Sequence, residues 1–172
     1  MNVILVGYMG SGKTTLGKKL AARLGLTFMD TDKIIEEQEA QSVDEIFATK
    51  GEAYFRKLEQ ALVEELKQLD HVLIATGGGM PCYNNLMEEL KTIGFTIYLK
   101  RPAKELAHRV KNSKKIRPLL RDKNEEELLA YMEAMLQKRA PYYEQAHLIV
   151  DREVQAIASL ELQIKALTRN WK

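Results

Sequence analysis

The feature that most constrains the fold of this chain is the glycine-rich segment GYMGSGKT at residues 7–14. It directly follows an apolar run, NVILV at residues 2–6, and directly precedes a stretch with helical periodicity, TTLGKKLAARLG at residues 14–25. A glycine-rich loop between a strand and a helix, with the spacing G-x-x-x-x-G-K-[ST], is the pattern that binds nucleotide phosphates. The alternative is a tight turn with a surface lysine, and that alternative does not require the strand and the helix on either side.

The backbone and the side chains of this loop have separate roles in phosphate binding. Its glycines let successive N–H groups turn toward phosphate oxygens, and the start of the helix adds a partial positive charge. Lys13 is placed to reach the β and γ phosphates, and the Thr14 hydroxyl is a ligand for Mg²⁺. We therefore predict a site for ATP and Mg²⁺ at Gly10, Ser11, Gly12, Lys13, Thr14 and Thr15.

Short β-branched runs alternate with longer amphipathic stretches along the chain. Leucines at helical spacing, such as Leu16, Leu20 and Leu24, mark the amphipathic stretches. This alternation predicts an α/β protein with a parallel sheet covered by helices in three layers. A length of 172 residues suits one domain, residues 1–172. The strands are predicted at residues 2–6, 26–30, 72–76, 95–99 and 147–150.

Charge and cysteine content narrow the partners and the compartment. The chain has 26 basic and 24 acidic residues, and its net charge of +2 gives little attraction to nucleic acid or to an anionic membrane. One cysteine, Cys82, is too few for an internal disulfide and fits a reducing compartment. The N-terminal apolar run is too short for a signal peptide or a membrane span. We expect a cytoplasmic protein without nucleic-acid or membrane partners.

Two carboxylates, Asp30 and Asp32, follow the second predicted strand in the segment FMDTDK. The carboxyl ends of parallel strands share one edge, so both acids are expected beside the phosphate-binding loop. One is suited to Mg²⁺ and the other to the molecule that receives the phosphoryl group. The alternative is a helix N-cap formed by Thr31 or Asp32, and the two roles are compatible. Asp151, after the last strand, is a weaker metal ligand than Asp30 and is predicted to cap the final helix.

The third predicted strand ends in a run of glycines instead of an acid, in the segment VLIATGGG at residues 72–79. Without side chains on Gly77, Gly78 and Gly79, a small polar molecule can approach the backbone N–H groups. The alternative is a flexible turn into the next helix.

Two charged segments complete the candidate site. Arg56 lies in an amphipathic stretch, where the simplest interpretation is a solvated side chain paired with Glu52 or Glu59. The segment KNSKKIRPLLRDKNEE at residues 111–126 separates two predicted helices and is expected to be an exposed, mobile loop.

Together these segments resemble the shikimate kinase family over nearly the whole chain. The likeness includes the phosphate-binding loop, DTD at 30–32, the IF…GE..FR..E pattern at 46–59, GGG at 77–79, RPLL at 117–120 and KRAPYYEQA at 138–146. The resemblance implies five parallel strands in the order 2-3-1-4-5 flanked by helices, with a mobile lid at about residues 111–124. It implies transfer of the γ-phosphoryl group of ATP to the 3-hydroxyl of shikimate, in the pathway to chorismate and the aromatic amino acids. It also implies a monomer.

The resemblance assigns a role to each candidate residue. Lys13 resembles the lysine that contacts the phosphates, and Thr14 and Asp30 resemble the magnesium site. Asp32 resembles the acid that orients or deprotonates the attacking hydroxyl. The guanidinium groups that hold the substrate carboxylate correspond to Arg56 and Arg139, and Glu59 is expected to hold Arg56 in place. The glycines at 77–79 resemble the wall beside the substrate. Arg117 resembles the lid arginine that covers the phosphates. Arg109 and Arg152 are weaker candidates for flanking adenine.

Two other functions are compatible with parts of the sequence. A related small-molecule kinase, such as a gluconate kinase, shares the phosphate-binding loop but is expected to differ in the substrate region. A binding or regulatory module that holds ATP without catalysis is disfavoured by the intact Asp30, Asp32 and Arg117.

Overall fold

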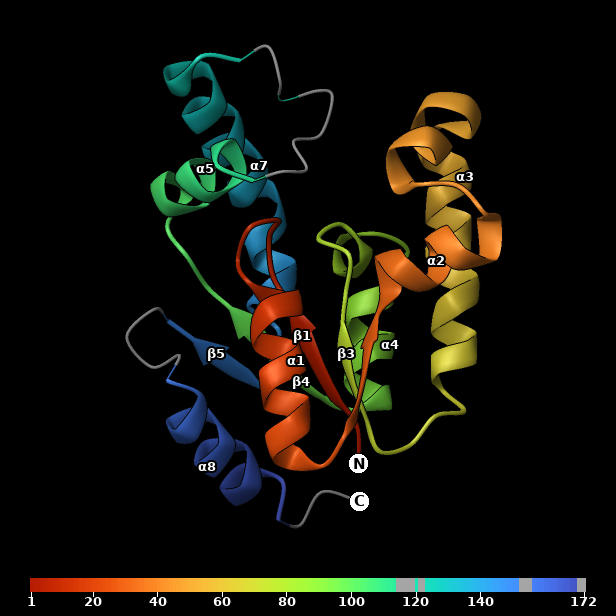
Figure 1. The fold of residues 1–172 in the computed structure, drawn as a ribbon, viewed down its shortest axis with the longest axis vertical. Coiled ribbons are helices and arrows are strands. Elements are labelled where there is room, and N and C mark those ends of the chain that lie inside the picture. The colour runs from red at the N-terminus through yellow and green to blue at the C-terminus, as the bar shows by residue number, and fades with distance from the viewer. Residues whose placement is uncertain (114–119, 121–122, 152–155, 170–172) are drawn as a thin grey trace.

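The computed structural model describes residues 1–113, 120, 123–151 and 156–169. Its centre is a single sheet of five parallel strands in the order β2-β3-β1-β4-β5, which confirms the predicted α/β architecture and strand order (Figure 1). The strands are β1 (Val3–Val6), β2 (Thr27–Asp30), β3 (Val72–Ala75), β4 (Phe95–Leu99) and β5 (Leu148–Val150).

Helices connect successive strands and cover both faces of the sheet. They are α1 (Lys13–Leu24), α2 (Thr31–Glu39), α3 (Val43–Leu66), α4 (Leu86–Ile93), α5 (Ala103–Lys111), α7 (Glu125–Tyr143) and α8 (Ile157–Leu167), with one 3₁₀ turn, η1 (Met80–Cys82). The prediction that Asp151 caps the final helix is wrong, because α8 begins only at Ile157 and has Ala156 at its N-cap position. None of the helices in the described ranges is both long and apolar enough to cross a membrane.

The core has two parts because successive side chains of a strand point to opposite faces. In β1, Ile4 and Val6 pack into the part formed with α3, α4 and α7. Val3 and Leu5 pack into the other part, against Leu20 of α1 and the apolar face of α8. All four β1 side chains are fully buried, so the strand that leads into the glycine-rich loop is the centre of the molecule.

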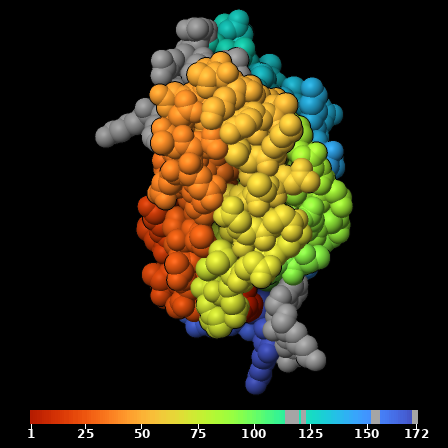
Figure 2. Space-filling view, turned by 90° about the vertical axis from the view of Figure 1, so that its right-hand side faces the viewer, coloured from red at the N-terminus to blue at the C-terminus, as the bar shows by residue number. Residues whose placement is uncertain are grey.

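Two groups of helices rise beyond the carboxyl ends of the strands. One consists of α5 and α7, and the other of α2 and the first part of α3 (Figure 1). Figure 2 shows that α2 and α3 form one continuous face of the molecule. Helix α3 starts with a capping box between Ser42 and Glu45 and is kinked at Gly51, where φ is 81° and ψ is 170°. The carboxyl edge of the sheet therefore lies between two helical walls.

Candidate active site

The glycine-rich loop joins β1 to α1 and adopts the backbone conformation that its sequence predicts. Gly10 and Gly12 have φ values of 79° and 97°, in the left-handed region that favours glycine. Lys13 is buried, and its ammonium group donates to the carbonyls of Gly7 at 2.7 Å and Tyr8 at 3.1 Å. The lysine side chain therefore folds back over its own loop.

A cavity of about 690 Å³ opens beside this loop at the carboxyl edge of the sheet. Its walls come from the loop, from the end of β2, from the glycine run after β3 and from the last turn of α5. Eight predicted nucleotide, metal and substrate residues line it together, namely Gly10, Gly12, Lys13, Thr14, Thr15, Asp30, Asp32 and Gly78. Arg109, the weaker candidate for flanking adenine, lines it as well. Ser11 is buried and does not line this cavity but a smaller one next to it, with Arg101 and Arg109.

Asp30 connects the end of β2 to the start of α1 and α2. One of its carboxylate oxygens accepts a hydrogen bond from the Thr14 hydroxyl at 2.7 Å, and the other caps α2 by accepting from the Lys33 N–H at 3.4 Å. The alternative interpretation, in which Thr31 or Asp32 forms the cap, is wrong, because Asp30 is the last extended residue and Thr31 is already helical. The Thr31 hydroxyl instead accepts from the Gly77 N–H at 2.8 Å.

Each glycine of the run after β3 borders a different part of the site. A Cβ atom on Gly77 would lie 2.5 Å from an oxygen of Asp32, and one on Gly78 would lie 3.3 Å from the Met9 backbone nitrogen. A Cβ atom on Gly79 would lie 2.6 Å from both terminal nitrogens of Arg56. Side chains at these three positions would therefore crowd Asp32, the Met9 backbone and Arg56, respectively.

Arg56 is held by two acids of its own helix. Its guanidinium donates to Glu52 at 2.8 Å and to Glu59 at 2.5 Å, so both predicted pairs form at once. The interpretation of Arg56 as a solvated side chain is wrong, because the side chain is only 11% exposed. Its guanidinium carbon also lies 4.0 Å from the centre of the Tyr83 ring. This fixed, planar donor faces the glycine run.

Glu59 is buried below Arg56. Burial raises the pKa of Glu59 to about 7, since the Arg56 charge only partly opposes the loss of water and the Asp32 charge adds to the rise. One oxygen pairs with Arg56, and the other, Oε1, is buried without a hydrogen-bond partner among the described residues. That second oxygen would lie 3.2 Å from a Cβ atom on Gly77, so it points toward the same wall as Asp32.

The titration of Glu59 gives a stability prediction. In the unfolded chain Glu59 loses its proton near pH 4.5, and in the folded chain it keeps the proton to about pH 7. The folded state therefore binds more protons between these values, so the free energy of unfolding is expected to fall as pH rises from about 5 to 7.5, by up to about 3 kcal/mol. Urea unfolding at both pH values measures this fall, and Glu59→Gln is expected to reduce it.

A matched control is Glu52→Gln. Its hydrogen bond with Arg56 lowers the pKa of Glu52, which is the opposite direction. Removing Glu52 is therefore not expected to reduce the fall in stability. An unchanged pH dependence in the Glu59→Gln variant would contradict the assignment.

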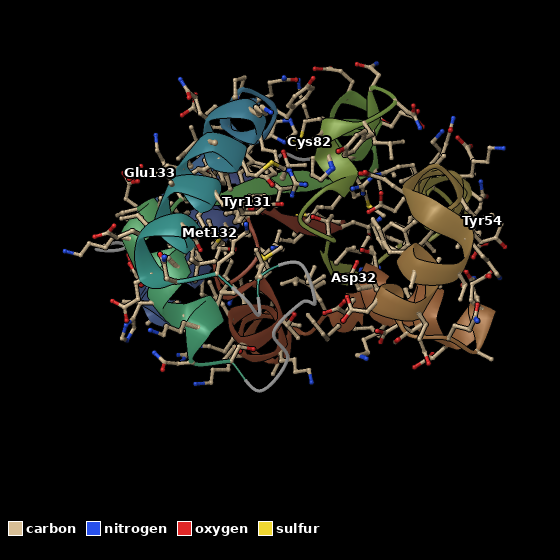
Figure 3. All side chains as sticks on the ribbon, turned by 90° about the horizontal axis from the view of Figure 1, so that it is seen from above. Asp32, Tyr54, Cys82, Tyr131, Met132 and Glu133 are labelled. Atoms are coloured by element: carbon tan, nitrogen blue, oxygen red, sulfur yellow. The ribbon has the colours of Figure 1, made fainter. Side chains whose placement is uncertain are left out.

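Helix α7 closes the other side of the glycine run. The Tyr143 hydroxyl donates to the Gly78 carbonyl, and burial raises the pKa of Tyr143. The guanidinium carbon of Arg139 lies 5.3 Å from the centre of the Tyr8 ring. Cys82, whose thiol pKa is also raised by burial, lies on η1 between these groups. Figure 3 looks down on this edge and shows Asp32 on the side of α2, with Tyr131 and Met132 on α7 across from it.

Sequence reasoning missed the tyrosines of the site. Tyr8, Tyr83 and Tyr143 contact Arg139, Arg56 and the glycine run, respectively. The available signal was the tyrosine pair in the segment KRAPYYEQA, which lies one turn beyond Arg139 on the same helix. Two predicted site residues, Arg117 and Arg152, lie outside the described residues, as does most of the predicted lid at 111–124.

The cavity beside the phosphate-binding loop reaches Asp32, and the glycine run connects Asp32 to the buried Arg56. A small-molecule kinase with a phosphate-binding loop needs such an arrangement, which places an acceptor next to the phosphates. The fold and the site therefore define a small kinase of the P-loop class. A family model for shikimate kinase matches residues 9–167 of this chain. The chain belongs to the shikimate kinase family.

Individual relatives agree with this assignment. A shikimate kinase of Parabacteroides distasonis is 45% identical over 151 residues, which cover 88% of this chain and 87% of that protein. The crystal structure of the shikimate kinase from Bacteroides thetaiotaomicron is 38% identical, with a TM-score of 0.89 and 98% of each chain covered. A shikimate kinase from Acinetobacter baumannii, solved in complex with shikimate, is 35% identical, with a TM-score of 0.84 and 99% and 94% of the two chains covered.

A gluconokinase from Sinorhizobium meliloti shares the fold at 17% identity and a TM-score of 0.58. At that identity the likeness shows the shared fold alone and gives no support for assigning this chain to the gluconate kinases.

Proposed function

We propose how this chain carries out the reaction of its family, the transfer of the γ-phosphoryl group of ATP to the 3-hydroxyl of shikimate, which yields shikimate 3-phosphate and ADP. The observation that carries the proposal is the glycine run. Through Gly77, Gly78 and Gly79 it borders Asp32, the phosphate-binding loop and Arg56 in turn. A small acceptor bound against the glycine run would therefore contact Asp32, the ATP phosphates and Arg56 at the same time.

The loop side of the cavity binds ATP. The N–H groups of Gly10, Ser11 and Gly12 and the start of α1 attract the phosphates, and Lys13 moves from its loop carbonyls to the β and γ phosphates. Thr15 lines the same cavity.

Mg²⁺ fits the oxygen donors beside the loop. The Thr14 hydroxyl and the Asp30 carboxylate are hard ligands, and they already contact each other at 2.7 Å. Among the described residues no three His, Cys, Asp or Glu side chains gather as a metal site. This suits Mg²⁺, which in kinases takes one or two protein ligands and completes its shell with water and phosphate oxygens. The ion would neutralise charge on the phosphates during transfer.

The acceptor is held by charge at one end and oriented at the other. Arg56 and Arg139 bind the carboxylate of shikimate, because paired guanidinium donors match a carboxylate's two oxygens. Asp32 accepts a hydrogen bond from the attacking hydroxyl and directs it toward the γ phosphate. Phosphoryl transfer has a loose transition state in most analyses, so positioning by Asp32 supplies acceleration whether or not the proton leaves early. Arg117, carried by the lid, covers the phosphates and stabilises the charge of the transition state.

The proposal has a direct test. Purified protein is incubated with ATP and Mg²⁺, and ADP release is followed with shikimate, with gluconate and without acceptor. We expect release that depends on shikimate. ADP release with gluconate alone would mean that gluconate, and not shikimate, is the acceptor. ATP binding without any ADP release would favour a regulatory module.

Localisation and assembly follow as proposals from the same function. We infer a cytoplasmic monomer without nucleic-acid partners, supported by the use of ATP as co-substrate and by a single, half-buried free cysteine, Cys82. Gel filtration with light scattering measures the oligomeric state.

Two alanine substitutions in the glycine run separate acceptor binding from chemistry. In Gly79→Ala the new methyl group meets the Arg56 guanidinium, so we expect KM for shikimate to rise at least about tenfold with little change in KM for ATP. In Gly77→Ala it meets Asp32, so kcat is expected to fall by about a hundredfold or more. Steady-state kinetics of both variants measure the two effects. The same change in both parameters for both variants would contradict separate roles.

A further inference from the structure

Arg101 lies between the end of β4 and the start of α5, and its side chain contacts the phosphate-binding loop. Figure 1 shows the connection between these two elements. Its side chain is only 10% exposed. Its Nε donates to the Ser11 carbonyl at 2.9 Å, and its terminal Nη1 donates to Glu105 at 2.5 Å. Arg101 is therefore fixed at both edges of its guanidinium group, once by the loop and once by α5.

A second arginine, Arg109, lies one turn beyond Glu105 on α5 and makes a similar pair of contacts. Arg109 contacts the same oxygen of Glu105, Oε1, at 3.2 Å, and donates to the Gly10 carbonyl at 3.3 Å. Glu105 thus joins two guanidinium groups, and these hold two successive carbonyls of the loop. The helix backbone itself lies close, because a Cβ atom on Gly10 would be 3.5 Å from the Leu106 carbonyl.

Holding a carbonyl also sets the direction of the next N–H group. A trans peptide is planar, and its C=O and N–H point in opposite directions. The described residues contain no cis peptide bond, so the Ser11 carbonyl and the Gly12 N–H are opposed. Arg101 draws the carbonyl to the side of α5, and Gly12 lines the cavity. The Gly12 N–H therefore points toward the space that phosphate oxygens occupy.

We propose that Arg101, oriented by Glu105, is a positioning residue for nucleotide binding, which keeps the Gly12 N–H directed at the phosphates. The inference rests on the proposed ATP site. Arg101 acts through the Ser11–Gly12 peptide, so its effect belongs to the phosphates and not to the base of the nucleotide. It also requires the paired donors of a guanidinium, because one edge holds the loop while the other holds Glu105.

Two simpler explanations make different predictions. If Arg101 only adds positive charge near the phosphates, lysine is an adequate substitute. If Arg101 only stabilises the fold, its loss weakens binding of every ligand alike and lowers the melting temperature to match.

The experiment is calorimetric titration of the full chain with ATP, ADP and adenosine, without acceptor. The variants are Arg101→Met, Arg101→Lys and Glu105→Gln. Lys100→Met is the matched control, because Lys100 is the preceding residue and pairs with Glu144 at 3.0 Å instead of with the loop. Thermal melting of each variant measures its stability independently.

We expect Arg101→Met and Arg101→Lys to weaken ATP and ADP binding by about tenfold or more, with adenosine affinity changed less than about twofold. Glu105→Gln is expected to show a smaller loss of the same kind, and Lys100→Met none. Wild-type affinity in Arg101→Lys would overturn the proposal in favour of charge alone. An equal loss for adenosine would overturn it in favour of a structural role. These titrations contain no acceptor, so they test the role of Arg101 independently of the reaction. If the chain bound ATP but did not phosphorylate shikimate, the proposed reaction would be wrong, and the titrations would still test the role of Arg101.

Discussion

Replacing Arg56 with methionine is expected to lower kcat/KM for shikimate by about a thousandfold while the affinity for ATP stays within about threefold. The first effect follows from the proposed role of Arg56 as a buried donor to the acceptor's carboxylate. Such an interaction between charges is worth several kcal/mol when one partner is removed. The second follows because Arg56 contacts Glu52, Glu59 and Tyr83 and does not line the cavity of the phosphate-binding loop.

The same substitution has a cost for the fold. It leaves Glu59 buried without its cation, which is expected to lower the free energy of unfolding by about 3 kcal/mol. The double variant Arg56→Met with Glu59→Gln removes the buried carboxylate as well, so its stability is expected to recover while its affinity for shikimate does not. Recovery of both would mean that Arg56 serves only to neutralise Glu59.

Urea unfolding and titration with shikimate measure these two properties separately. Lys57→Met is the control, because Lys57 is the next residue on α3 and is exposed. It is expected to change neither property.

The second large effect is expected for Asp32→Asn, which keeps the size of the side chain and removes its charge. We expect kcat to fall by about a thousandfold, within the range for a group that orients or accepts a proton, with the affinity for ATP changed less than about threefold. Single-turnover rates and ATP titration measure the two quantities. An equal loss of rate and of ATP binding would contradict the role of Asp32 in orienting the acceptor.

Asp30→Asn is the matched comparison, since Asp30 lies two residues earlier in the chain and lines the same cavity. Its contact with Thr14 places it at the proposed magnesium site, so its loss is expected to raise the Mg²⁺ concentration needed for activity. If both variants responded to Mg²⁺ in the same way, the separate roles of the two acids would be wrong.

Periodicity was sufficient for the elements of the fold but not for their arrangement. The five predicted strands match β1 to β5 to within one residue at each end, because most are short apolar runs bounded by polar or glycine residues. The order of strands in the sheet came from the resemblance to a family, since spacing along the chain does not determine which parallel strands are neighbours.

Residues close in sequence were easier to predict than contacts between distant segments. The pairs of Arg56 with Glu52 and Glu59 follow from helical spacing alone. The contacts of Gly77 with Asp32 and of Gly79 with Arg56 join segments from different strands and helices, and a single sequence does not encode them visibly. From the sequence, the glycine run was expected only to offer backbone N–H groups to a ligand. The structure adds that Asp32 and Arg56 occupy the space that side chains at Gly77 and Gly79 would need.

The position of Lys13 has a consequence for how tightly a nucleotide can bind. Its side chain is buried, so the ammonium group has lost most of its water, and it is hydrogen-bonded to the Gly7 and Tyr8 carbonyls. In the proposed ATP site, phosphate oxygens would replace those two bonds with stronger ones to charged acceptors, and little further dehydration of the lysine would be required. Folding thus supplies the desolvation of this charge in advance. Under the proposed function, the loop would be electrostatically preorganised for the transition state as well as for ATP.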